Sequence, residues 1–273
     1  MANVNIPNSE ELRQEKLYRR ILGDEDPNSL NGLSKQALFC TMTGDYPQAL
    51  ELSKKVYALR CEELGEEHPD TLNALRNVAA IHYDLGNYSQ ALELFEKVYD
   101  ELYCRVYGEE HPETLILLGV IANTCRELGD CFRALALYEK LYALRCRVYG
   151  EEHTATLYSL EDLAATYHAL GDFSQALELY EKLYALHCKV DGEKHPATLS
   201  SLHDLAVTYG DLGDSERALA LYEKLYALRC RIYGKEHPDT LESLEDLAES
   251  YETLGDPQRA AEYRDKAAAW RKG

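Results

Sequence analysis

The sequence predicts an all-α fold, a right-handed α-α superhelical solenoid of six helix hairpins with an N-terminal cap helix. The prediction comes from a glycine that recurs with one alanine seven residues before it and another five residues after it. The glycines are Gly44, Gly86, Gly129, Gly171, Gly213 and Gly255. The alanines before them are Ala37, Ala79, Ala122, Ala164, Ala206 and Ala248, and those after them are Ala49, Ala91, Ala134, Ala176, Ala218 and Ala260. Their interval is 42 residues, once 43, and such a period is typical of repeats that stack on their neighbours.

Between these fixed points the apolar residues are spaced as on one face of an α-helix. Steps of three and four residues connect Leu157, Leu160, Leu163, Ala164, Tyr167 and Leu170. The same period resumes after Gly171, so each unit is predicted to be two antiparallel helices around a glycine turn. The alanines would then lie where the two helices cross, because small side chains let the backbones approach closely.

The chain organisation follows from this register. We expect residues 1–27 to form a tail and a cap helix, the helix covering residues 9–22. Six repeats are expected to follow at about 28–69, 70–112, 113–154, 155–196, 197–238 and 239–271. Most boundaries contain glycine, then histidine and proline three and four residues later, which signal a helix end and a helix start. The histidines at or near the helix N-caps are His68, His111, His195 and His237.

Two places depart from the regular unit. The segment Asp100–Cys104 holds one residue more than Ala143–Cys146, which predicts a π-bulge or a local distortion in that helix. In the last helix Arg264 replaces a tyrosine and Ala268 another, as expected of a polar end that stops the stacking. We therefore expect the chain to be complete.

Composition limits the classes of function. The net charge of -19 disfavours contact with a phosphate backbone, so we expect no nucleic-acid partner. No stretch resembles a secretory signal or a bilayer-spanning segment, and we expect a cytoplasmic chain without membrane contact. Five of the eight cysteines recur at one position of the repeat, which indicates packing and not a disulfide framework.

One motif recurs in the sequence: a small residue, then Leu-Gly-Asp/Asn, then an aromatic residue, and then alanine. This motif resembles the tetratricopeptide repeat over roughly residues 28–271. The 42-residue unit with its Gly-x-x-His-Pro-x-Thr boundary resembles the repeat of kinesin light chains. That resemblance implies a concave surface, made by the first helix of each pair, that captures peptide segments. It also implies that asparagines before Leu-Ala hold the peptide backbone, and of those positions only Asn77 keeps the amide here. No heptad coiled coil precedes the repeats, so we do not predict a motor-subunit role.

The same register predicts which side chains would contact a peptide. They are Asn73, Arg76, Asn77, Ile116, Gly119, Val120, Asn123, Arg126, Tyr158, Glu161, Asp162, His203, Asp204, Glu245, Asp246 and Glu249. The first helices at 155–170, 197–212 and 239–254 contain acids but no lysine or arginine, which favours a basic partner. The alternative is that these acids only solvate an exposed face.

A second feature of this predicted surface is the patch of Ile116, Gly119 and Val120. A glycine inside a helix costs about 1 kcal/mol relative to alanine, which favours close approach of a partner backbone there. The alternative is a local change of helix contacts caused by the extra residue upstream.

These patterns predict a non-catalytic scaffold that binds peptide segments, basic and with an apolar anchor. Two alternatives stay open: a regulatory or sensor subunit of a separately encoded signalling enzyme, and a self-assembling structural element. We expect a monomer or a weak homo-oligomer.

No residues suggest catalysis, a cofactor or a metal site. The recurrent Cys-x6-His spacing is not that of structural zinc, which usually needs four converging ligands, and packing plus capping explains it. No phosphate-binding loop, His-Glu-x-x-His sequence or nucleophile elbow is present.

Overall fold

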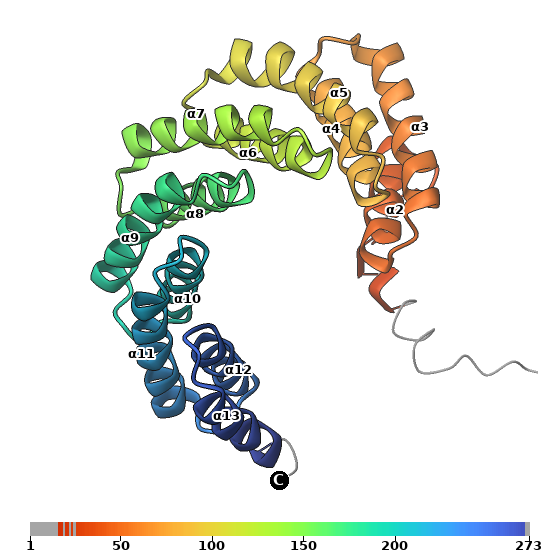
Figure 1. The fold of residues 1–273 in the computed structure, drawn as a ribbon. Coiled ribbons are helices and arrows are strands. Elements are labelled where there is room, and N and C mark those ends of the chain that lie inside the picture. Colours follow the sequence, from red (N-terminus) through yellow and green to blue (C-terminus); the bar gives the residue numbers. More distant parts are fainter. Residues whose placement is uncertain (1–15, 19, 22, 24–25, 271–273) are drawn as a thin grey trace, which may run out of the picture. The chain divides into compact units, whose positions relative to one another are not determined.

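The computed structural model describes residues 16–18, 20, 21, 23 and 26–270, and every regular element among them is a helix (Figure 1). The chain divides into two compact units, residues 1–137 and 138–273, which are described separately below. Within the predicted cap helix, residues 16–18, 20 and 21 are helical, and the other predicted residues lie outside the described ones.

In the first unit, helices that follow one another in the chain pack against each other. They are α2 (Leu30–Thr43), α3 (Tyr46–Leu64), α4 (Pro69–Asp84), α5 (Tyr88–Val98), the π-helix η1 (Tyr99–Tyr107) and α6 (Pro112–Glu127). Helix α7 (Cys131–Tyr149) contains the point at which the chain passes into the second unit.

The second unit has the same sequential packing. Its further helices are α8 (Thr154–Ala169), α9 (Phe173–Val190), α10 (Pro196–Asp211), α11 (Ser215–Tyr233), α12 (Pro238–Thr253) and α13 (Pro257–Trp270). Within this unit α8, α10 and α12 lie on one side of the stack, and α9 and α11 lie on the other (Figure 1).

The hairpins close around the recurring alanines and glycines. All twelve alanines of the repeat register are buried, at most 6% exposed, because the two helices of each hairpin meet there. At the turn, Gly44 has φ of 81° and Gly171 has φ of 80°, a left-handed conformation that favours glycine.

Each leading helix of the later repeats begins at a capping histidine, as predicted for four of them. The Nδ1 atom of His195 accepts the backbone N–H of Ala197 at 3.3 Å. The caps confirmed by the structure are His68, His111, His195 and His237, and His153 caps α8 in the same way. A side-chain acceptor here satisfies one of the free N–H groups of the first turn.

The predicted π-bulge is confirmed and extends over the whole of η1. The extra residue is absorbed by π-type turns, so Leu102 and Tyr103 still point into the core. At the other end of the chain, Arg264 of α13 is exposed, and its Nη2 lies 2.7 Å from Oε2 of Glu252.

Candidate functional site

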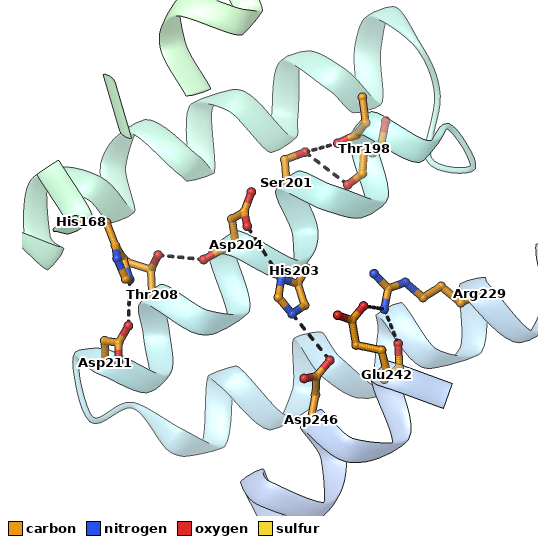
Figure 2. Close-up of polar contacts among 12 residues, drawn as sticks. His168, Thr198, Ser201, His203, Asp204, Thr208, Asp211, Arg229, Glu242 and Asp246 are labelled. Atoms are coloured by element: carbon orange, nitrogen blue, oxygen red, sulfur yellow. Dashed lines mark hydrogen bonds and ion pairs between the residues drawn. The ribbon is translucent and has the colours of Figure 1, made fainter. Parts of the chain in front are cut away.

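The leading helices α8, α10 and α12 of the second unit are bridged by pairs of residues that lie 43 positions apart. His168 Nε2 of α8 is 2.8 Å from Asp211 Oδ2 of α10. His203 Nε2 of α10 is 3.6 Å from Asp246 Oδ2 of α12. The three helices therefore present one common polar face (Figure 2).

A hollow of about 510 Å³ opens on this face between α10, α11 and α12. Small residues shape part of it, since Gly210 and Ser215 leave room where longer side chains would fill the space. Its charged and aromatic lining consists of His203, Asp211, Tyr222, Glu242, Asp246 and Glu249.

The imidazole of His203 is held between two carboxylates. Its Nδ1 lies 3.7 Å from Asp204 Oδ1 and its Nε2 lies 3.6 Å from Asp246 Oδ2. Asp204 and then Asp246 raise the pKa of His203 to about 9, against the opposing effect of burial. The ring is therefore an imidazolium at neutral pH. It lies edge-to-face with the ring of Tyr222, with 5.9 Å between the ring centroids.

The carboxylates of this face still outnumber the cations. Asp246 Oδ2 is buried and accepts no hydrogen bond, because the distance to His203 exceeds hydrogen-bonding range. Burial and then the nearby Asp204 raise the pKa of the Glu161 carboxyl, so acids on α8 and α10 repel each other. An excess of negative charge around a hollow attracts and orients cationic groups.

One group near the hollow was missed by the sequence reasoning. Arg229 of α11 is 7% exposed, and its Nη1 donates to the carbonyl oxygen of Asp239 at 2.7 Å and to Ser243 Oγ at 2.8 Å. The same Nη1 lies 3.2 Å from Glu242 Oε2. Arg229 therefore fixes the first turn of α12 to the preceding helix.

Two other repeats have the same arginine contact. Arg60 donates to the carbonyl of Asp70 at 2.7 Å, and Arg145 donates to that of Ala155 at 2.8 Å. The sequence signal for this contact is the recurring Ala-Leu-Arg-Cys segment, in which the arginine precedes the repeated cysteine.

None of the sixteen predicted contact residues is fully buried. In the first unit, Arg76 Nη1 donates to Tyr103 Oη at 2.7 Å, and that hydroxyl lies 3.4 Å from Asn73 Oδ1. Exposed in this unit are Asn77, Ile116 and Arg126, and half-buried are Gly119, Val120 and Asn123.

In the second unit the predicted residues extend beyond the hollow. Exposed are Tyr158, Glu245 and Glu249, and half-buried are Glu161, Asp162, His203, Asp204 and Asp246. The structure brings His203, Asp246 and Glu249 together at the hollow.

Within the described residues, no three histidine, cysteine or acidic side chains gather in a way that could hold a metal ion. In the same part of the chain, no helix has both the length and the apolar character that crossing a bilayer requires.

These hairpins match the models of a known repeat family. A tetratricopeptide-repeat model matches residues 28–100 and 120–189, and a second model of the same description matches residues 198–239. The chain belongs to the tetratricopeptide-repeat family. A comparison with curated proteins finds no match.

Solved structures identify the type of tetratricopeptide repeat. The chain is 30% identical to the TPR-like repeats of a protein described as a kinesin light chain from Podosopora anserina, with a TM-score of 0.67. That similarity covers 75% of this chain and 97% of the other, so the repeats are of the kinesin-light-chain type.

More distant structures share the fold alone. BtubC (BKLC) from P. vanneervenii is 19% identical over 88% of this chain and 91% of its own, with a TM-score of 0.64. The apo form of RapI is 12% identical over 89% of this chain and 97% of its own, with a TM-score of 0.62. The tetratricopeptide-repeat fold is typical of protein-interaction scaffolds.

Proposed function

We propose that this chain is a non-catalytic scaffold that binds a basic peptide segment on the face formed by α8, α10 and α12. The observation that supports the proposal is the hollow between α10 and α12, whose lining contains four carboxylates beside His203. Those carboxylates are Asp211, Glu242, Asp246 and Glu249.

The shape and charge of the hollow suit a lysine or arginine side chain. Glu249 is exposed at the edge of the hollow, so its carboxylate can accept hydrogen bonds from a ligand. An arginine donates several N–H groups in a fixed plane, and such charge-assisted bonds are stronger than neutral ones. The aromatic ring of Tyr222 provides a surface on which the guanidinium can also pack.

His203 competes with the peptide in this proposal. Its imidazolium occupies the space between Asp204 and Asp246 and neutralises part of their charge. Replacing it with an uncharged residue would release that charge to a ligand. The His203→Gln variant should therefore bind a basic peptide more tightly than the wild type, although its fold loses an ion pair.

The experiment uses a pool of lysine- and arginine-rich peptides and fluorescence anisotropy at low and high salt. The test variant combines Asp211→Asn, Glu242→Gln and Glu249→Gln, which leaves the contacts of His203 in place. We expect about tenfold weaker binding and a smaller salt dependence, because fewer charges face the peptide.

A matched variant separates this face from the acidity of the whole chain. Glu178→Gln, Glu216→Gln and Glu262→Gln change the net charge equally at exposed positions on α9, α11 and α13. This control should bind like the wild type. Equal weakening by both triple variants, or a preference of the wild type for acidic peptides, would contradict the proposal.

A further inference from the structure

The first unit contains a hollow at the position that corresponds to the acidic hollow of the second unit, but its lining is different. It lies between α2, α3 and α4 and has a volume of about 190 Å³. Its apolar lining consists of Ala37, Leu38, Val56, Ala74, Ala80 and Ile81. The position is equivalent because Leu38 corresponds to Val207, and Asn77 to Asp246, in the repeat register.

Two hydroxyl groups around this hollow are already satisfied by their own helix. Ser34 Oγ donates to the carbonyl of Leu30 at 2.8 Å, and Thr41 Oγ1 donates to that of Ala37 at 3.0 Å. These side chains therefore add little polarity to the hollow.

The decisive difference lies at Ser53, nine residues after the turn glycine. The following four hairpins have Phe95, Tyr138, Tyr180 and Tyr222 at the same register position. The first three of these rings are 3%, 0% and 5% exposed, so they fill the space between successive helices. Ser53 lines the hollow with a side chain too short to do so.

We propose that this hollow binds an aromatic side chain of the partner segment, in the space that an aromatic ring of the chain itself takes in the next hairpins. Apolar cavities of about 150 Å³ admit a benzene ring, so the volume here is sufficient. The inference rests on the proposed function and identifies where the apolar anchor of the partner is bound.

The surroundings of the hollow add two features of the partner. Leu38 of α2 lines the hollow and is 53% exposed, so its side chain can cover one flank of a bound ring. Asp84 is the charged residue of the lining, which favours a lysine or arginine next to the aromatic residue.

The first test uses indole as the probe and saturation-transfer NMR as the readout. Wild type and Ser53→Ala should bind indole, whereas Ser53→Phe should not, because the new ring occupies the hollow as Phe95 does in the next hairpin. Circular dichroism and urea denaturation check that Ser53→Phe is folded. Should that variant misfold, Leu38→Asn changes an exposed side chain instead and is expected to weaken indole binding. Undiminished binding to a folded Ser53→Phe variant, or none to the wild type, would overturn the proposal.

The second test compares two pools of basic peptides that have Phe or Ser at one position. The wild type should bind the Phe pool about tenfold more tightly, a preference that Ser53→Phe should abolish. If both pools bind equally while the acidic-face variants still weaken binding, the aromatic site is wrong and the proposed function stands. If indole binds to the wild type and not to Ser53→Phe, but no basic peptide binds, the hollow is supported and the proposed function fails.

Discussion

The charged state of His203 predicts a specific pH dependence of stability. The folded protein raises the pKa of this histidine from 6.5 to about 9, through Asp204 and Asp246. That difference corresponds to an upper limit of about 3 kcal/mol of stabilisation. Since 27% of the side chain is exposed, solvent screening reduces the contribution, and we expect about 1–2 kcal/mol.

The sign follows from the direction of the shift. A raised pKa means that the folded state holds the proton more tightly, so the stabilisation is complete below pH 6.5. It is lost as the pH rises through about 9. The free energy of unfolding of the wild type should therefore exceed that of His203→Gln most at pH 6, and this difference should shrink by about 1–2 kcal/mol by pH 9.5.

Urea denaturation of both proteins across this pH range measures the difference, in which other titrating groups cancel. An Asp246→Asn background provides the control, because it removes one of the two carboxylates that face the imidazole. The pH dependence attributable to His203 should then fall to roughly half. If the difference in the free energy of unfolding between wild type and His203→Gln stays constant from pH 6 to pH 9.5, His203 is not stabilised as an imidazolium by these two acids.

Three further predictions concern packing and burial. Arg229→Ala should lower the free energy of unfolding by about 2–4 kcal/mol, whereas Ala at the exposed Arg231 should change it little, as measured in urea. Gly210→Ala should stabilise the protein by about 0.5–1 kcal/mol, because the new Cβ would meet Ala218 Cβ at an ordinary 4.0 Å, and a lower thermal midpoint would contradict this. Burial lowers the pKa of His82, so stability should fall as the pH drops below 6.5, and His82→Phe should reduce that loss in denaturation at pH 5 and 7.

The architecture was predictable because each local signal agrees with the repeat. The histidine caps required only a boundary and a proline, and the π-helix required only one extra residue before Cys104. These features depend on neighbouring residues in the chain. A period and a helix-start rule were therefore sufficient to locate them.

The Arg229 contact and the position of His203 between two carboxylates were not predictable in the same way. Both depend on the rotation of one hairpin against the next, which determines whether a side chain meets a carbonyl, a carboxylate or solvent. Similarly, the sequence shows that Ser53 replaces an aromatic residue, but only the packing of α2, α3 and α4 shows that the space stays open.

The contacts between leading helices suggest how this information could be recovered from sequence. The pairs His168 with Asp211 and His203 with Asp246 are both 43 residues apart, one more than the repeat. The spacing of 43 in place of 42 means that each leading helix contacts the next with an offset of one position along its face. The same offset pairs Glu161 with Asp204, whose negative charge adds to burial in raising the pKa of Glu161. In regular 42-residue repeats, opposite charges at positions 43 apart on leading helices therefore hold neighbouring hairpins together. Two acids at such positions instead leave a negative electrostatic potential that a basic ligand can neutralise.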